Sequence, residues 1–308
     1  MNELTVSVSP HIRGKRTTQN IMLDVILALM PALVASVMIF GVRSLLLTAI
    51  SAAACVFFEY IWEKGHKSEI TIGDLSAVVT GILLAYNVPV DMPVWQLIVG
   101  DAAAILVAKM LFGGIGCNFM NPALVGRIVL MFSFTSEMTT YAYPKNAIDA
   151  LSSATPLAVL DKLSMSDLPQ LLYGIHGGVI GETCMIALLI GGVYLMLRKV
   201  ISPAIPLSYL GATLLFSWLF GGSQPILAIF SGGVMLGAFF MATDYVTSPF
   251  ATKGKLIFGL GCGFITAVIR VFGNYNEGVT FAILLMNLVV PYINDLTMTK
   301  PLGGVTEK

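Results

Sequence analysis

Apolar runs long enough to cross a lipid bilayer recur along almost the whole chain. A helix of about twenty apolar residues spans the hydrocarbon core of a membrane, and ten segments approach this pattern. They are 21–40, 45–62, 75–88, 94–112, 123–134, 179–197, 204–220, 226–241, 256–272 and 279–293. Because backbone groups in lipid must be paired within the chain, such segments form helices. The sequence therefore predicts an all-α polytopic membrane protein.

Composition supports this class and excludes several others. Of the 308 residues, 56% are hydrophobic and 11% are charged, whereas about 25% of residues in soluble domains are charged. The formal net charge is zero, so no basic surface suggests nucleic acid. The four cysteines and three histidines are scattered without metal-ligand spacing, which argues against an iron–sulfur site or a disulfide framework. We expect the histidines to lie in interfacial loops. The polar, basic first twenty residues show no cleavable signal.

Basic residues predict the orientation, because cytoplasmic loops of membrane proteins are enriched in Lys and Arg. With the N-terminus inside, thirteen basic residues face the cytoplasm, namely Arg13, Lys15, Arg16, Lys64, Lys67, Lys109, Arg127, Arg198, Lys199, Lys253, Lys255, Lys300 and Lys308. Four remain outside, namely Arg43, Lys145, Lys162 and Arg270. Both termini are then cytoplasmic, and the long polar interval in mid-chain is external.

That polar interval divides the ten segments into two sets of five. Because five is odd, two halves that share a fold would have inverted orientations, as in many transporters with broken helices. The predicted units are a cytoplasmic tail, a first half, an external loop, a second half and a second cytoplasmic tail, at 1–20, 21–134, 135–178, 179–296 and 297–308. Two polar interruptions, 118–123 and 243–249, are the expected helix breaks.

The external loop contains Asp149-Ala150-Leu151-Ser152-Ser153-Ala154-Thr155-Pro156. Thr followed by Pro is typical of a helix start, with Thr155 as the N-cap. Unpaired N–H groups at such an end attract phosphate. Simple capping is the plain interpretation of Thr-Pro, and phosphate attachment to the hydroxyl is the alternative.

The longer match favours the second alternative. The stretch from Asp149 through Ser152, Ser153 and Ala154 to Thr155 resembles the flavinylation motif of the integral-membrane subunits of the Rnf and sodium-pumping NADH:quinone oxidoreductase complexes. In that family, FMN is joined through its phosphate to the final Thr by a separate flavin transferase. The resemblance therefore implies a covalent FMN on Thr155, which would make the chain a flavoprotein and a phosphoprotein.

A second stretch, Gly113-Gly114-Ile115-Gly116-Cys117-Asn118-Phe119-Met120-Asn121-Pro122-Ala123, must interrupt a regular helix. Asn118 and Asn121 are three residues apart, so on a helical turn their amides would face one way. They could simply satisfy the broken backbone. The run also resembles the Asn-x-x-Asn-Pro-Ala element of the same family, which implies that these amides hold a second, noncovalent flavin (riboflavin).

Segments 74–84 and 243–249 match the same family in order and spacing, so the resemblance covers most of the chain. It implies an electron carrier in a bacterial inner membrane, within a complex that links ferredoxin to NAD and exports Na⁺ or H⁺. Partners would include a second flavin subunit and iron–sulfur subunits. The chain length favours the Rnf branch of the family, and the quinone-reducing branch is the alternative. No GxGxxG or P-loop is evident, so NAD would bind elsewhere.

Asp101 and Lys109 are ionisable residues within one apolar segment, eight residues apart and hence about two turns along one face. Such groups are costly in a membrane and suggest function. Asp101 is therefore a candidate for the path of the coupling ion, and a structural or anchoring pair with Lys109 is the alternative. Five other acidic residues lie nearer segment ends and are expected to be solvated, namely Asp24, Glu59, Glu182, Asp244 and Asp295.

Two further interpretations stay open on the residues alone. A channel or secondary transporter for a small solute would have the same apolar segments and inverted halves. A purely structural membrane subunit is the third possibility. Neither of these would carry a flavin.

Overall fold

The computed structural model describes residues 16–142, 165–174, 176–222, 224–273 and 278–298, and over these residues it is helical without strands. The first half contains α1 (Thr18–Phe40), α2 (Val42–His66), η1 (Ile72–Asp74), α3 (Ser76–Tyr86), α4 (Val94–Ala102), η2 (Ala103–Val107), η3 (Met110–Phe112), α5 (Pro122–Ser133) and α6 (Thr135–Thr139). The short η5 (Met165–Asp167) and α7 (Leu168–Tyr173) come next. The second half contains α8 (Met185–Leu197), α9 (Ala204–Leu219), α10 (Pro225–Ile229), α11 (Val234–Leu236), η6 (Gly237–Met241), α12 (Thr252–Phe272) and α13 (Val279–Thr297).

Each of the ten predicted apolar segments coincides with one of these helices or helix groups. Five helical stretches are long and apolar enough to cross a membrane, namely Thr18–Phe40, Val42–His66, Val94–Phe112, Thr252–Phe272 and Val279–Thr297. Four shorter apolar helices, α3, α5, α8 and α9, have 11 to 16 residues. The all-helical membrane class is therefore confirmed.

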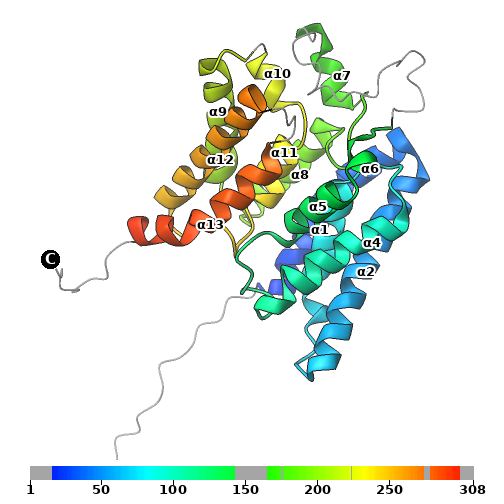
Figure 1. Ribbon diagram of the computed structural model, residues 1–308. Coiled ribbons are helices and arrows are strands. Elements are labelled where there is room, and N and C mark those ends of the chain that lie inside the picture. Colours follow the sequence, from blue (N-terminus) through cyan, green and yellow to red (C-terminus); the bar gives the residue numbers. More distant parts are fainter. Residues whose placement is uncertain (1–15, 143–164, 175, 223, 274–277, 299–308) are drawn as a thin grey trace, which may run out of the picture.

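The helices form two groups that meet along a central contact (Figure 1). The group of α2, α3, α4 and α5 lies on one side, and α9, α12 and α13 lie on the other. α1 packs against α8, and α5 packs against α13, so these pairs join the two groups. Small residues allow the closest approaches: a Cβ on Gly191 of α8 would lie 2.1 Å from the carbonyl oxygen of Ala28 in α1.

Large apolar side chains lie on the outer surface of the helices as well as in the buried core. Large apolar residues such as Met38, Phe57, Trp218 and Leu288 are exposed on the outer helix faces, where lipid would cover them. The buried face of α2 is mostly polar: beside Leu47 it carries Ser44, Thr48, Ser51, Cys55, Glu59 and Glu63. Polar groups within the bundle must find partners there, because lipid offers none.

Both predicted helix breaks are present, and each follows a π-helical turn. η2 is a π-helical turn that ends the regular part of the α4 segment, and Gly113, Gly114 and Gly116 then adopt positive φ. η6 is a second π-helical turn, after which 242–251 is non-helical. Such turns recur at functional sites.

The structure corrects several expectations about charged residues. Glu59 and Glu182 are buried rather than solvated, as is Asp24, and only Asp295 of that set is exposed. Lys109 and Arg127 do not face the cytoplasm, since their exposed fractions are 3% and 2%. Each has polar partners from distant segments, and no local pattern reveals such partners. His176, predicted to be interfacial, is also buried.

Candidate functional site

A pocket of about 810 Å³, including its open mouth, lies where the two helix groups meet. The first turns of α1, the N-terminal half of α3, and both helix breaks form its wall. Most of its lining is apolar with a few polar groups, as is usual for cofactor pockets. The two interruptions predicted from the sequence, far apart in the chain, therefore meet at one cavity.

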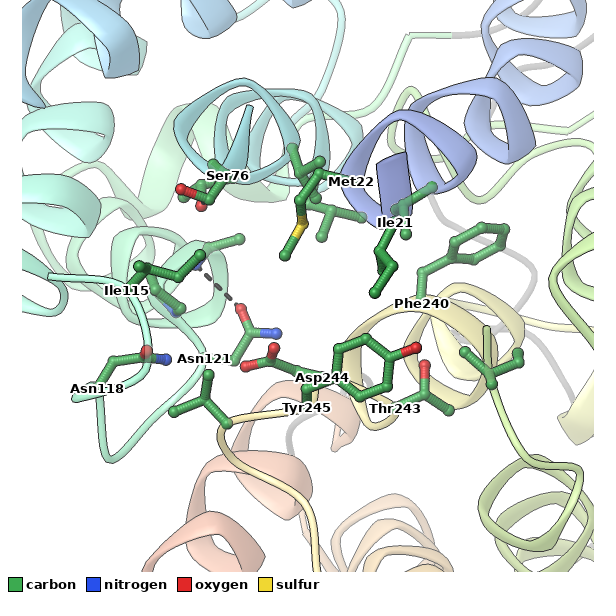
Figure 2. A pocket seen from close by; sticks show the side chains of 18 of the residues that line it. Ile21, Met22, Ser76, Ile115, Asn118, Asn121, Phe240, Thr243, Asp244 and Tyr245 are labelled. Atoms are coloured by element: carbon green, nitrogen blue, oxygen red, sulfur yellow. Dashed lines mark hydrogen bonds between the residues drawn. The ribbon is translucent and has the colours of Figure 1, made fainter. Parts of the chain in front are cut away.

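Figure 2 shows how the two breaks face the cavity. Asn118 and Asn121 lie on one side beside Asp244 and Tyr245, with Ser76 across from them. The prediction that both Asn side chains lie on one helical turn is wrong, because α5 begins only at Pro122. Their amides reach the same cavity nevertheless, since the non-helical chain folds around its edge.

Asn121 holds the two breaks together. Its Oδ1 accepts hydrogen bonds from the backbone N–H groups of Ala123 (3.0 Å) and Leu124 (3.4 Å), which makes it the N-cap of α5. Its Nδ2 donates to the carbonyl of Met241 at the end of η6, at 3.2 Å. The expectation that this residue satisfies a broken backbone is confirmed, and the same side chain also lines the pocket.

Asn287 of α13, which the sequence analysis missed, supports the segments that line the pocket. With its amide in the orientation that satisfies both of its ends, it donates to the carbonyl of Thr247 at 3.1 Å and accepts from the N–H of Asn121 at 3.2 Å. It therefore links both breaks to the last helix. The available signal was a lone amide in the middle of an apolar segment, which is costly in a membrane without a partner.

Lys109 brings a positive charge to the pocket wall. Its Nζ lies 2.6 Å from Oε1 of Glu59 in α2 and 2.7 Å from the hydroxyl of Ser76 in α3. The alternative of a structural Asp101–Lys109 pair is therefore wrong. The π-helical turn of η2 lies between the two residues and inserts an extra residue, so they no longer share a face.

Asp101 of α4 lies away from the pocket and is fully buried where α4 packs against α2. Its Oδ1 contacts the Ser51 hydroxyl at 2.5 Å and the Cys55 sulfur at 3.4 Å. Its Oδ2 has no hydrogen-bond partner among the described residues. The structure thus separates the two candidate sites of the first half, one at the pocket and one inside the helix group.

A second polar cluster lies beyond the pocket, at the C-terminal end of α3. Arg127 donates to Oδ1 of Asn87 at 2.6 Å. Glu182 lies close to Arg127, because both approach Gly233: a Cβ on that glycine would lie 3.3 Å from Glu182 Oε2 and 3.8 Å from an Arg127 nitrogen. Arg127 and Glu182 come from different halves of the chain, so this cluster brings the halves together at that end. His176 lies between α7 and α8, ahead of Glu182 in the chain. Burial lowers the pKa of its imidazole below the ordinary value of 6.5.

The predicted flavin-attachment residues Asp149, Ser152, Ser153, Ala154 and Thr155 lie outside the described residues. Before them the described chain ends beyond α6, and after them it resumes with η5 and α7. Among the described residues no cluster of three or more metal-ligating side chains is present.

Comparison with known proteins gives a match along nearly the whole chain. Residues 5–303 match the model of the NQR2, RnfD, RnfE family. The chain belongs to this family. The match includes both helix breaks and residues 149–155, so the family resemblance seen in the motifs is confirmed.

Three individual members of the family match this chain over nearly their full lengths. The chain is 47% identical to the D subunit of the Na(+)-translocating ferredoxin:NAD(+) oxidoreductase complex of Acetobacterium woodii, covering 100% of this chain and 98% of that protein. It is 40% identical to the D subunit of the proton-translocating ferredoxin:NAD(+) oxidoreductase complex of Clostridium ljungdahlii, covering 98% and 97%. It is 34% identical to the D subunit of the ion-translocating oxidoreductase complex of Actinobacillus succinogenes, covering 96% of each chain.

Proposed function

We propose that this chain is the membrane electron-carrier subunit, of the RnfD type, in a complex that transfers electrons between ferredoxin and NAD and exports an ion. The observation that carries the proposal is the full-length match to the corresponding subunits of two ferredoxin:NAD oxidoreductase complexes. The pocket at the meeting point of two broken helices supports it, because its apolar walls with a few polar groups are typical of cofactor sites.

The first redox group in this proposal is FMN, joined by a phosphoester to the Thr155 hydroxyl. The support is the sequence from Asp149 to Thr155, which resembles the family's attachment motif. Ser152, Ser153 and Ala154 would be the residues that a separate flavin transferase recognises. On an external loop, a covalent bond would prevent loss of the cofactor from the cell.

The second redox group would be a noncovalent flavin, riboflavin, in the pocket. The residues fit this group: an isoalloxazine ring needs apolar walls and a few hydrogen-bonding groups at its edge, and the pocket offers Phe239 and Leu83 beside Asn118. Flavin supplies one- and two-electron transfer, which side chains cannot provide. The protein's own part is to orient the ring with the Asn118 amide and to place the Lys109 charge near it.

Ten crossings in two inverted halves belong to this proposal. Arg198 at the end of α8 pairs with Asp24 near the start of α1 at 3.1 Å. Because the end of one helix lies beside the start of the other, α1 and α8, the first helices of the two halves, run in opposite directions. Asn87, just beyond α3, contacts the sulfur of Met241 at the end of η6 at 3.8 Å, so the short third helices of the halves meet end to end. Both contacts are those that an inverted repeat would make.

The coupling ion would pass through the first half near Asp101, the carboxylate buried in mid-helix. The names of the relatives differ on the ion, being Na⁺ in one and a proton in the other. The complex would lie in a bacterial inner membrane with both termini of this chain in the cytoplasm. Its partners would be a second flavin subunit, iron–sulfur subunits and the subunit that binds NAD.

Intact-mass spectrometry tests the proposal most directly. We expect the chain, coexpressed with its flavin transferase, to carry one FMN-sized adduct on the peptide containing Ser152 to Thr155, and to fluoresce in a denaturing gel. Thr155→Ala should lose the adduct and the fluorescence. Thr140→Ala is the matched control, because it removes an exposed threonine hydroxyl outside the motif, and it should retain both. An unmodified mass with no bound flavin would instead favour a solute transporter of similar fold.

A further inference from the structure

The contacts of Asp101 allow its protons to be counted. The Ser51 oxygen lies 2.5 Å from Asp101 Oδ1 and 2.8 Å from the carbonyl oxygen of Gly81. A serine hydroxyl has one hydrogen and can donate to one acceptor at a time. A carbonyl oxygen carries no hydrogen, and neither does an ionised carboxylate. One of these two short contacts would therefore lack a hydrogen if Asp101 were ionised.

A protonated Asp101 satisfies both contacts. The carboxyl then donates from Oδ1 to the Ser51 oxygen, and the Ser51 hydroxyl donates to the Gly81 carbonyl. An O–H···O distance near 2.5 Å is at the short end of such hydrogen bonds. The Gly81 carbonyl cannot change its role, because it belongs to the backbone of α3.

The surroundings also disfavour a charge on this side chain. Asp101 is fully buried, and its Oδ2 has no partner among the described residues. An ionised carboxylate in an apolar interior needs a cation or several donors, whereas a neutral carboxyl with one bare oxygen costs much less. The nearby cation, Lys109, is already paired with Glu59.

The site lacks the features of a sodium site. Hard cations prefer several oxygen ligands, and a thiol is a soft ligand. Cys55 supplies sulfur on one side, and the Ser51 and Asp101 oxygens are too close together to hold an ion between them. On the side of Ser51 the backbones of α2 and α3 are closely packed, since a Cβ on Gly81 would lie 2.6 Å from the Cα of Ala52.

Titratable neighbours on the packed helices are few. From α2, the Cys55 thiol faces Asp101, and Glu59 follows one turn farther in its pair with Lys109. From α3 no carboxyl, amine or imidazole faces it over Ser76–Tyr86. Arg127 of α5 is directed to Asn87 at the end of α3. The protonation state of Asp101 is therefore decided by its own hydrogen bonds and its burial.

We propose that Asp101 is a proton-binding site, occupied by one proton in the conformation described, and that it does not bind Na⁺. The proposal rests on the coupling role suggested above for Asp101 and specifies its ligand. On this basis the proton on Oδ1 is hydrogen-bonded to the Ser51 oxygen while α2 and α4 are packed together.

Infrared difference spectroscopy on the purified complex tests this inference. We expect a carbonyl band of a protonated carboxyl at neutral pH, which shifts in D₂O and is lost in Asp101→Asn. The amide of Asn can donate to Ser51 as the neutral carboxyl does, so this variant should assemble normally. Ser51→Ala should keep the band and shift its frequency, because the carboxyl loses its acceptor. Asp295→Asn, an exposed carboxylate, is the matched control and should leave the band unchanged.

Three outcomes are decisive. Absence of the band from the wild-type complex would overturn the proposal, and so would a band that disappears on addition of Na⁺ but not of K⁺. A band assigned to Asp101 together with full ion transport in Asp101→Asn would support the proton site and instead overturn the coupling role. The inference and the proposed function can therefore fail separately.

Discussion

Lys109 Nζ lies 2.6 Å from Oε1 of Glu59, and both side chains are almost fully buried. The pair joins the α4 segment to α2 across 50 residues of sequence, and the same ammonium lines the pocket. A buried pair adds little net stability over an apolar replacement, but loss of one partner leaves an uncompensated charge.

This relationship predicts a non-additive pair of substitutions. Lys109→Met should destabilise the protein by about 3 kcal/mol, because Glu59 would stay buried without a counter-ion. The double variant Glu59→Gln/Lys109→Met should recover most of the loss. Thermal unfolding in detergent, followed by tryptophan fluorescence, measures the cycle. Additive effects of the two substitutions would show that the pair is not coupled.

Two substitutions of Asn121 should distinguish its role as the N-cap of α5 from its role in binding the noncovalent flavin. Asn121→Asp keeps an oxygen that caps α5 but cannot donate to the Met241 carbonyl, whereas Asn121→Ala loses both contacts. We expect the Ala variant to lose about 1 kcal/mol from the cap, and both variants to release noncovalent flavin. Flavin extracted by denaturation, compared with covalent flavin retained in a gel, measures the second effect. Asn20→Ala, at an exposed position outside the pocket lining, is the control and should retain both flavins.

Gly191 should be intolerant of any side chain. Its missing Cβ would lie 2.1 Å from the Ala28 carbonyl oxygen, where α8 meets α1. Gly191→Ala should force these helices apart and lower the yield of folded protein severalfold, as overpacking does in well-packed interiors. Gly211→Ala on α9 is the matched control, since nothing lies within 4 Å of that position. Size-exclusion profiles in detergent compare the two, and equal profiles would contradict the predicted close contact.

Because the imidazole of His176 is buried, we expect the stability of the folded protein to depend on pH. Burial lowers the pKa of its imidazole, and its Nδ1–H donates to the Gly177 carbonyl at 3.0 Å. Below about pH 6.5 the unfolded chain therefore binds a proton that the folded protein does not, so stability falls as the pH decreases through this value. His176→Gln should flatten this part of the profile of unfolding temperature against pH. His66→Gln, at an exposed position, is the control, and a slope unchanged in His176→Gln would refute the assignment.

Part of the site could be predicted from local sequence. Glycines and Pro122 cannot continue a helix, so the break at 113–121 and the polar groups beside it were evident. The second break at 243–249 was evident in the same way, and both proved to line one pocket. Asn287 was not predicted, because a single amide in an apolar run shows no partner until the last helix is packed against the breaks.

The sequence by itself determined that this chain is helical and belongs in a membrane, and it determined its family. These properties depend on the length and composition of contiguous segments and on short motifs, all of which are local. Only the tertiary structure decided that Glu59 and Lys109 are a buried pair, that Asp101 faces Ser51 and Cys55, and that Arg127 lies in the interior. The physical reason is that the environment of an ionisable group depends on its partners, and these partners lie about 40 to 50 residues away in the sequence.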